Sequence, residues 1–480
     1  MYLDKIKTWY PTVALFTVLL CVSLAITYMM ANTGAIIAPL IFLIIIGISV
    51  VGAVVRDFRL GYYLLLLMGI FMFYVERLFK TGFPFGTVYD GLAALTFLAV
   101  FINGYYKRDW TNFRNPITIA FIVITLYQVM QVVNPSAVSR VAWLVAMRNN
   151  SSILLYVVAF QMFATINDVK RFTIFWLSIC LLVAMYGAYQ EWFGLLDFEN
   201  RWINESPERL ALYFIWGKMR KFSFLSDPSA FGLFTGMGAL ACFALALGPF
   251  KPFLRFILMA SAIFIFMAML YSGTRTANAM VSSGIVFYIL VTLKSRRTLI
   301  ATLVVGFIGG IIFFGPFYSG TANRLRSTFT PSEDPSMVVR DMKRQRFQKY
   351  VQSHPIGAGL YTTGTNGLRY SRGHELAQGW DPDSGYLQIA LELGSIGLIM
   401  FQVFFFIVMV KGINNYFSIN DPLLKAYNLA YLVPFFALTV AHFTQDAVFT
   451  KPMNLIGIAA YAVIVKIQTF ERRLYSVDLV

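Results

Sequence analysis

Arginine side chains stand beside short polar turns that interrupt long apolar runs of the sequence. Arg275 ends the polar turn Ser272-Gly-Thr-Arg275, and the pair Arg220 and Lys221 directly precedes the polar segment 223–232. The planar guanidinium group donates two parallel hydrogen bonds and therefore suits a phosphate or a diphosphate. A simpler interpretation stays open, in which these arginines only reach towards lipid headgroups.

Three acidic residues near these turns could cap a helix or accept a proton. Asp227, followed by Pro228, is typical of the residue that caps the first turn of a helix, whose N–H groups also attract anions. Asp383 stands just before Tyr386 at the start of a later apolar run, where cap and general base are both open. Glu392 lies inside that run, and a carboxylate within a membrane normally faces a polar cavity or a partner.

A long polar segment, residues 318–384, carries further cations. Its middle, residues 338–352, has the pattern of an amphipathic helix that includes Arg340 and Arg346. The turn His354-Pro-Ile-Gly-Ala-Gly359 should end this helix, and its glycines permit close backbone approach or a positive φ. A loop of this length is usually functional or disordered.

The composition of the 480 residues sets the class of protein. Hydrophobic residues make up 58% of the chain and charged residues 13%, against about 25% charged in a globular domain. This excludes a cytosolic enzyme, a disordered chain and a secreted disulfide scaffold, and it indicates many membrane spans. The three cysteines lie in apolar runs and are interpreted as small hydrophobic residues, while only three histidines disfavour a histidine-built metal site. The net charge of +16 is therefore interpreted through the distribution of basic residues between the two sides of a membrane and not as a sign of nucleic-acid binding.

Apolar runs predict an all-α polytopic bundle of about 12–14 transmembrane helices. The fourteen candidate spans are 11–31, 35–55, 61–75, 88–103, 116–133, 151–166, 172–190, 229–248, 253–271, 276–293, 298–317, 385–410, 426–442 and 453–467. With the N-terminus in the cytoplasm, all the connections on the cytoplasmic side are basic, as the positive-inside rule requires. We therefore expect both termini in the cytoplasm, and the first span kept as an anchor rather than cleaved as a signal peptide.

The chain divides into five regions on this interpretation. They are N-terminal transmembrane helices at 1–190, a first long extracytoplasmic loop at 191–228, central transmembrane helices at 229–317, a large extracytoplasmic loop at 318–384 and C-terminal transmembrane helices at 385–480. The candidate reactive residues fall on the extracytoplasmic face, where nucleotide sugars are absent.

The outer segments, taken in order, resemble those of the bacterial O-antigen ligase and O-antigen polymerase superfamily. The resemblance covers roughly residues 220–400 and rests on four motifs: Phe222-Ser-Phe-Leu-Ser-Asp-Pro-Ser-Ala-Phe-Gly232, Ser272-Gly-Thr-Arg275, His354-Pro-Ile-Gly-Ala-Gly359 and Asp383-Ser-Gly-Tyr-Leu-Gln-Ile-Ala-Leu-Glu-Leu-Gly-Ser-Ile-Gly397. The first half of the chain contributes only its hydrophobic helices.

The resemblance implies a GT-C-like membrane glycosyltransferase of the bacterial inner membrane that works at the outer face without metal or other cofactor. Its partners would be an undecaprenyl-diphosphate-linked glycan donor, a glycan acceptor, the lipid bilayer and, as a further candidate, a chain-length regulator protein. The candidate site residues are Asp383 and His354 for catalysis, Arg220, Lys221, Arg275, Arg340 and Arg346 for the donor diphosphate, and Asp227, Ser272, Tyr386 and Glu392 in support.

One departure from the family pattern favours a polymerase over a ligase. Ligases of the superfamily typically show His-Asn before Tyr-Leu, whereas this chain has Asp383-Ser384 two residues ahead of its Tyr-Leu pair. An aspartate with a raised pKa could take the proton of the attacking sugar hydroxyl, and a single base favours inversion at the anomeric carbon.

Three alternatives remain open. A ligase that transfers glycan to lipid A core or to protein would share this chemistry. A lipid-linked oligosaccharide flippase or other transporter would place its polar features near the middle of the membrane, often in two repeats, and no repeat is evident. A dolichyl-phosphate enzyme needs a large first outer loop, for which residues 32–34 leave no room.

Overall fold

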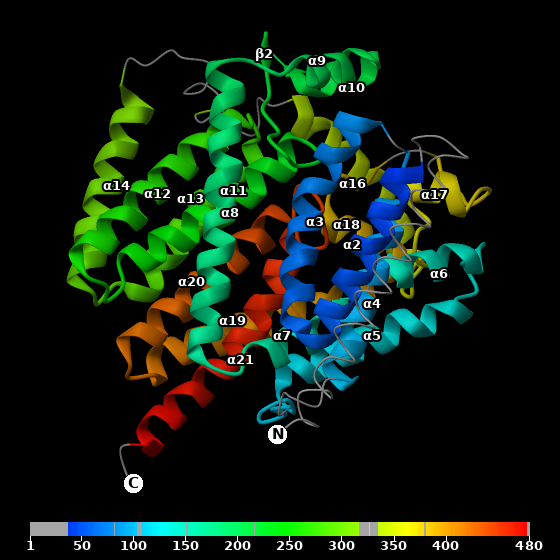
Figure 1. Ribbon diagram of the computed structural model, residues 1–480. Coiled ribbons are helices and arrows are strands. Elements are labelled where there is room, and N and C mark those ends of the chain that lie inside the picture. Colours follow the sequence, from blue (N-terminus) through cyan, green and yellow to red (C-terminus); the bar gives the residue numbers. More distant parts are fainter. Residues whose placement is uncertain are drawn as a thin grey trace, which may run out of the picture.

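The computed structural model describes residues 37–80, 82–102, 108–149, 152–215, 217–315, 326, 335–378 and 381–477. The described chain is a bundle of helices with one two-stranded sheet, which confirms the predicted all-α polytopic membrane protein (Figure 1). Ten helical segments in these ranges are long and apolar enough to cross a membrane. The first predicted span, 11–31, lies outside the described residues.

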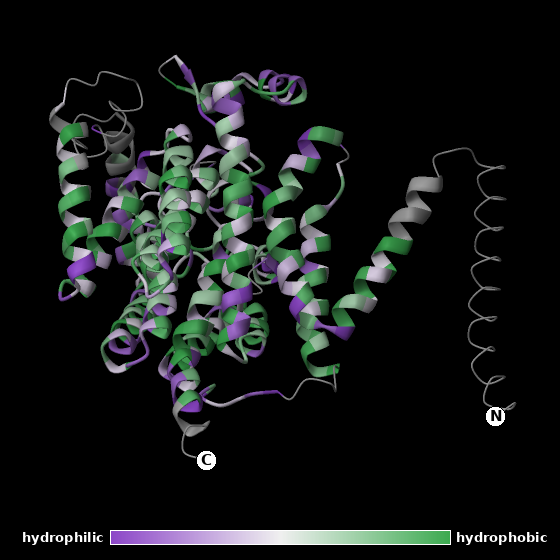
Figure 2. Ribbon diagram, turned by 60° about the vertical axis from the view of Figure 1, so that its left-hand side comes forward, coloured by the Kyte–Doolittle hydropathy of each residue, from purple (hydrophilic) through white to green (hydrophobic). Residues whose placement is uncertain are grey.

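The first half of the chain forms a series of helices joined by short connections. These are α2 (Ile37–Arg56), α3 (Phe58–Phe79), α4 (Phe85–Ile102), α5 (Pro116–Met130) with the 3-10 turn η1 (Gln131–Val133), α6 (Arg140–Asn149), α7 (Ser152–Met162) and α8 (Ile166–Trp192). They match most of the spans predicted in this region. The predicted span 151–166 contains only the 11-residue α7, and the candidate crossing there, Arg140–Met162, also includes α6. Hydrophilic residues gather towards the ends of the bundle and hydrophobic residues between them (Figure 2).

The second half continues the same pattern and adds the helices of the long polar segment. These are α11 (Pro228–Ala246), α12 (Pro252–Tyr271), α13 (Arg275–Thr292), α14 (Arg296–Phe314), α16 (Pro335–Ser353), α17 (Gly364–Tyr370), α18 (Gly385–Glu392), α19 (Gly394–Ser418), α20 (Pro422–Ala441) and α21 (Met453–Val477). Helix α16 contains the amphipathic helix predicted at 338–352.

The predicted first long loop, 191–228, is ordered at one end of the bundle. It forms α9 (Asp197–Asn204), α10 (Pro207–Tyr213) and an antiparallel pair, β1 (Phe214–Ile215) and β2 (Lys218–Met219), at the top of Figure 1. We refer to this end as the upper end and to the opposite end, where α21 finishes, as the lower end.

Helices α11, α20 and α21 form the centre of the bundle. Within the protein, 94% of the spanning window of α21 and 89% of that of α11 are buried, against 22% for the peripheral α12. Small residues let α11 lie close to its neighbours, since a Cβ at Gly238 would lie 2.2 Å from the Cys180 sulfur and one at Gly236 would lie 2.4 Å from Met280 Cε. This close packing fixes the start of α11 at the upper end.

The predicted span 385–410 is wrong as a single helix, because the chain breaks between α18 and α19. Gly394 has φ +72°, a left-handed conformation that only glycine adopts without strain. The turn 354–359 packs against the break: Ala358 N donates to Leu391 O (2.8 Å) and Gly359 N to Glu392 O (2.9 Å). The glycine-rich turn that sequence analysis singled out therefore holds a broken helix in place.

Gly394→Ala should strongly destabilise this region. A Cβ there would lie 2.0 Å from Pro355 O, and the positive φ adds about 1–3 kcal/mol of strain. We expect a lower midpoint of thermal unfolding for the detergent-solubilised protein. Gly91→Ala in α4, where a Cβ meets nothing within 4 Å, should leave the midpoint unchanged or raise it slightly. Equal midpoints for the two variants would contradict this account of the break.

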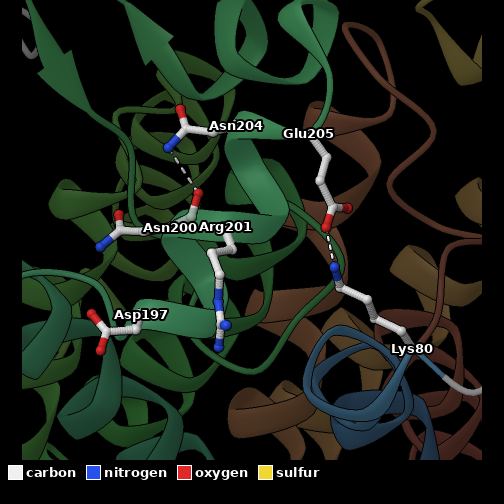
Figure 3. A pocket seen from close by; sticks show the side chains of 6 residues that line it. All are labelled: Lys80, Asp197, Asn200, Arg201, Asn204 and Glu205. Carbon is white, nitrogen blue, oxygen red and sulfur yellow. Dashed lines mark hydrogen bonds and ion pairs between the residues drawn. The ribbon is translucent and has the colours of Figure 1, made fainter.

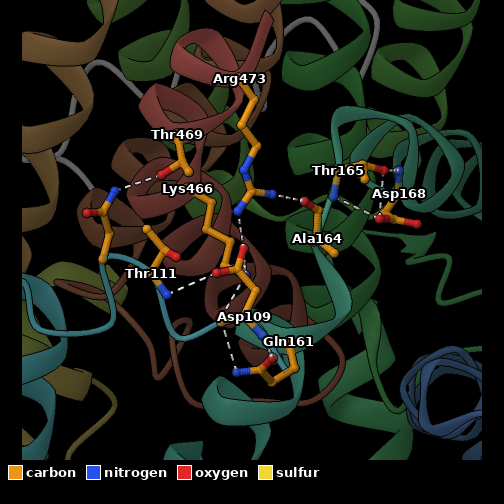
Figure 4. A network of polar contacts seen from close by, with 10 residues as sticks. Asp109, Thr111, Gln161, Ala164, Thr165, Asp168, Lys466, Thr469 and Arg473 are labelled. Carbon is orange, nitrogen blue, oxygen red and sulfur yellow. Dashed lines mark hydrogen bonds and ion pairs between the residues drawn. The ribbon is translucent and has the colours of Figure 1, made fainter. Parts of the chain in front are cut away.

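A polar network at the lower end ties α21 to the loop after α4 (Figure 4). Arg473 Nη2 donates to Asp109 Oδ2 (2.5 Å), and its Nη1 donates to Ala164 O (3.1 Å). The buried Lys466 places Nζ 3.9 Å from the same carboxylate, which Thr111 N also binds (3.0 Å). Asp109 thus neutralises part of the cationic charge that gathers at this end.

Asp109→Asn should lower the free energy of unfolding by about 2 kcal/mol, between the effects of exposed and buried ion pairs. Although burial alone raises its pKa, hydrogen bonds from Thr111 and Arg473 outweigh burial and lower the pKa of Asp109 to about 2. The ionised carboxylate therefore stabilises the fold above about pH 4, and this contribution is lost as the pH falls through 2. Thermal unfolding of wild type and variant at pH 7 and pH 3 checks this. The exposed Asp197→Asn serves as the control, and a gap that widens at pH 3 would contradict the assignment.

Candidate functional site

Two cavities of about 550 Å³ each lie side by side near the upper end of the bundle. One contains two arginines and three aspartates, and we call it the arginine cavity; the other contains two tyrosines and several amides, and we call it the tyrosine cavity. Asp446 and Thr450 line both cavities. The polar part of the arginine cavity is made by Arg220, Asp227, Ser229, Thr274, Arg275, Thr276, Asp383, Thr444, Gln445, Asp446 and Thr450.

Arg220 is held rigidly in the wall of the arginine cavity. Its side chain comes from the segment after β2, donates from Nε to Ser272 O (3.0 Å) and from Nη2 to Thr274 Oγ1 (2.8 Å), and is 9% exposed. Two positions that sequence analysis placed in separate motifs, 220 and 272–275, are therefore one structural unit. The guanidinium shapes the turn that carries the second arginine.

Arg275 is the first residue of α13 and lines the arginine cavity. The turn before it contains Gly273 at φ +60°, which lets the chain reverse between α12 and α13. The Thr274 hydroxyl accepts a hydrogen bond from Arg220 and donates one to Pro228 O (3.2 Å), and it does not cap α13. The cavity therefore receives a cationic side chain at the positively polarised start of a helix, an arrangement that favours an anion.

Asp227 and Asp383 lie on the wall of the same cavity in different roles. Asp227 caps α11: its Oδ1 accepts from Ser229 N (2.8 Å) and Ala230 N (3.0 Å). At α18 the cap is Ser384, whose hydroxyl accepts from Leu387 N (3.4 Å). Asp383 precedes that cap with φ +59°, so its carboxylate is not the helix cap that sequence analysis left open.

Arg77 holds the loop that leads to Asp227. This buried side chain donates to Leu225 O (2.6 Å) and Ser223 O (2.9 Å), and its guanidinium lies 4.6 Å from the centre of the Phe222 ring. Sequence analysis left Arg77 out of the candidate site. The structure gives it a positioning role beneath the arginine cavity.

Asp446 stands in the wall between the two cavities, in the connection between α20 and α21. Its side chain keeps 38% of its accessible surface and lines both cavities. Burial in the protein raises the pKa of Asp446 to about 6, in spite of hydrogen bonds from Phe449 and Thr450. Its Oδ1 has no hydrogen-bond partner among the described residues and lies 3.6 Å from Nδ1 of His442.

The His442 ring is an uncharged support for this connection. It is fully buried, and burial lowers the pKa of His442 to about 3. Nδ1 of His442 accepts hydrogen bonds from Ala447 N (3.2 Å) and Val448 N (3.4 Å). The ring lies so close to Gly385 that a Cβ on this residue would be 2.0 Å from His442 Cε1. His442 therefore links the Asp446 connection to the start of α18.

The tyrosine cavity has an amide-rich and aromatic lining. Its polar side chains are Gln128, Arg148, Asn149, Ser152, Ser226, Tyr361, Asn366, Arg369, Tyr370, Gln388, Glu392, Asp446, Thr450, Lys451 and Asn454. The Tyr361 and Tyr370 rings stack with centroids 6.2 Å apart, and Asn149 Nδ2 donates to Tyr361 Oη (2.9 Å). The Asn454 Oδ1 atom is buried and has no hydrogen-bond partner in the described chain.

Glu392 fastens the loop 361–363 to the broken helix. Its carboxylate accepts from Tyr361 N (3.1 Å), Thr363 N (3.4 Å) and Thr363 Oγ1 (2.6 Å). Burial raises the pKa of Glu392 to about 7, and these hydrogen bonds oppose that shift. Glu392 was predicted to face a polar cavity or a partner, and it lines the tyrosine cavity. Its hydrogen bonds also hold the segment that carries Tyr361.

Asp90, a carboxylate within the candidate spanning helix α4, was not singled out in the sequence. Its two oxygens lie 3.1 Å from Arg148 Nε and 3.8 Å from Lys451 Nζ. Both cations line the tyrosine cavity, so Asp90 fixes them there. A charge inside the apolar run 88–103 was the signal that could have revealed it.

The remaining predicted site residues are not among those that line the arginine cavity. Lys221 pairs with Glu191 (3.4 Å), Ser272 forms the turn under Arg220, and Tyr386 donates to Thr439 O (2.8 Å). His354 lines neither cavity: its ring stacks on Tyr350 and its Nδ1 lies 2.9 Å from Ser353 Oγ. Arg340 and Arg346 belong to α16, but their side chains lie outside the described residues.

The polar hollow of about 760 Å³ beneath α9 is separate from both cavities (Figure 3). Lys80, Asp197, Asn200, Arg201, Asn204 and Glu205 line it, and Lys80 pairs with Glu205. None of these residues lines the arginine or the tyrosine cavity. The hollow therefore supplies matched surface positions for control substitutions.

The segment that contains the turn at Arg275 and the helix break is similar to a known protein family. Residues 260–402 match the family model described as O-antigen ligase. No curated protein matches the chain. Arg275, Asp383 and Glu392 lie inside the matched segment, whereas Arg220 and Asp446, which complete the two cavities, lie outside it.

Proposed function

We propose that this chain is a glycosyltransferase of the O-antigen ligase and O-antigen polymerase superfamily and that it polymerises lipid-linked oligosaccharide repeat units. The match of residues 260–402 to the O-antigen ligase family model supports this proposal. The donor is a glycan on undecaprenyl diphosphate, and the acceptor is a sugar hydroxyl of the next lipid-linked unit. The reaction takes place at the extracytoplasmic face of a bacterial inner membrane, which is the upper end of the bundle. The GT-C-like fold, the cytoplasmic termini and a role for a chain-length regulator are parts of the same proposal.

The observation that carries this function is the arginine cavity. It brings Arg220, Arg275 and the starts of α11 and α13 together at one end of the membrane-spanning helices. A lipid diphosphate has its charged group at that level and its polyprenyl chain in the hydrocarbon region. Arg220, which is held by hydrogen bonds to Ser272 and Thr274, and Arg275 at the start of α13 suit a diphosphate with its two or more negative charges.

The chemistry follows from this placement. An acceptor hydroxyl attacks the anomeric carbon, a new C–O bond forms, and the bond from that carbon to the diphosphate oxygen breaks. The diphosphate leaves with the electron pair, and the preorganised arginines stabilise its growing negative charge in a low-dielectric site. Two carboxylates besides the Asp227 cap lie on this wall, Asp383 and Asp446, and one of them accepts the hydroxyl proton. Attack from the side opposite the diphosphate inverts the anomeric configuration.

The alternative acceptor is lipid A core or protein, which would make the chain a ligase. The residue pair Asp383-Ser384, in place of the His-Asn pair of ligases, favours the polymerase.

Purified protein given lipid-linked repeat units distinguishes these functions. A ladder of longer lipid-linked glycans is the expected result. Transfer only after addition of a lipid A core acceptor would replace the polymerase by a ligase. Neither product, together with passage of the glycolipid across liposomes, would replace both by a transporter.

A further inference from the structure

The lining of the tyrosine cavity has the chemistry of a carbohydrate site. Sugar hydroxyls donate and accept hydrogen bonds, and the side-chain amides of Gln128, Asn366 and Asn454 offer both kinds of group. Tyr361 and Tyr370 add aromatic faces and edges against which the C–H faces of a sugar ring can pack. An apolar pocket for a lipid tail would have neither feature.

One polar atom in this cavity lacks a partner that a hydroxyl would supply. Asn454 Oδ1 is buried without a hydrogen bond among the described residues, and an unpaired buried acceptor costs about 1–3 kcal/mol. Asn454 lies in the first turn of the central helix α21, beside Lys451 and Thr450, which also line the cavity. A hydroxyl donor bound there would satisfy it.

The place where the cavities meet decides which carboxylate reaches the acceptor. Asp383 lines the arginine cavity alone, whereas Asp446 lines both. A base must contact the attacking hydroxyl and lie beside the anomeric carbon at the same time. Among the described residues, Asp446 and Thr450 are the two that line both cavities, and Thr450 has no acidic or basic group at neutral pH.

We propose that the tyrosine cavity binds the acceptor glycan and presents its hydroxyl to Asp446, which takes the proton as that oxygen attacks the anomeric carbon of the donor in the arginine cavity. This assignment rests on the proposed glycosyl transfer. The O–H proton passes to the Asp446 carboxylate, the C–O bond forms, and the lipid diphosphate departs with the bonding electrons. Tyr361, Tyr370 and the amides then select the acceptor sugar.

Acceptor kinetics test the site directly. The probe is the repeat-unit oligosaccharide, freed from its lipid by mild acid, titrated against full-length protein at a fixed concentration of lipid-linked donor. Tyr370→Ala and Asn366→Ala should raise the KM for this acceptor about tenfold and leave the KM for the donor unchanged. Tyr370→Phe, which keeps the ring, should stay close to wild type. Asn200→Ala in the surface hollow is the matched amide control.

A split between binding and turnover tests the role of Asp446. Asp446→Asn should bind the oligosaccharide in saturation-transfer NMR as well as wild type but lose about 1,000-fold in kcat. Unchanged acceptor KM in both cavity variants, with an active wild type, would overturn this inference and leave the proposed function standing. No transfer by the wild type to any acceptor would overturn the proposed function itself.

Discussion

Arg275→Ala is expected to reduce kcat/KM for the lipid-linked donor about 1,000-fold. Arg275 lies at the start of α13 in the arginine cavity. In the proposed mechanism its guanidinium stabilises the charge that develops on the leaving diphosphate. Loss of one preorganised donor of this kind costs about 10²–10³ in rate, and the loss of a full positive charge places the effect at the upper end. Initial rates of lipid diphosphate release measure it.

Two further variants distinguish the loss of the Arg275 charge and of its planar shape from a general effect on folding. Arg275→Lys keeps the charge but loses the planar pair of donors, so it should recover only part of the rate. Arg201→Ala in the hollow of Figure 3 removes an exposed arginine from the same end of the molecule and should behave as wild type. Wild-type kcat/KM in Arg275→Ala, with an unchanged midpoint of thermal unfolding, would remove Arg275 from the donor site.

The rate of transfer should fall about tenfold per pH unit below pH 6, and Asp446→Asn should abolish this acidic limb. A base works only in its ionised form, and burial raises the pKa of Asp446 to about 6. The carboxylate is therefore charged and active above pH 6 and protonated and inactive below it. Full pH profiles of kcat/KM for wild type and variant check the assignment.

The other charged and titratable groups around Asp446 define the controls for this profile. They are His442 beside it, Arg220, Arg275, Asp227 and Asp383 across the arginine cavity, and Arg148, Arg369, Lys451 and Glu392 across the tyrosine cavity. Glu392 is the one whose raised pKa, about 7, lies closest, so Glu392→Gln must keep the limb at pH 6. Asp383→Asn must also keep it, whatever its rate. A limb that disappears with Asp383→Asn and persists in Asp446→Asn would make Asp383 the base.

Much of the fold could be predicted because the membrane imposes it. Runs such as 116–133 have no alternative to a helix in lipid, since each backbone N–H must be paired within its own segment. The helix break at Gly394 could not be predicted, because it depends on contacts with the turn 354–359, more than thirty residues earlier in the chain. Both segments contain glycines, yet only the fold shows that these glycines meet.

Those residues of the candidate site that are charged and lie next to long apolar runs could be predicted from the sequence. Arg220, Arg275 and Asp383 were chosen for their positions beside apolar runs, and the structure places them on one cavity. Asp446 escaped notice because its segment carries no motif and looks like an ordinary connection between two spans. Its place depends on His442 and on the packing of α18 against that ring. The tyrosine cavity likewise joins many distant parts of the chain, from Met72 to Asn454, which no local pattern reveals.

The central claim is glycosyl transfer from a lipid diphosphate to a second glycan, and its products test it most directly. The measurement is mass spectrometry of the lipid and glycan products after incubation of purified protein with lipid-linked repeat units and EDTA. The account predicts one molecule of free undecaprenyl diphosphate for each new glycosidic bond, together with lipid-linked glycans of two or more units. Unchanged substrate, or monophosphate lipid as the released product, would contradict it.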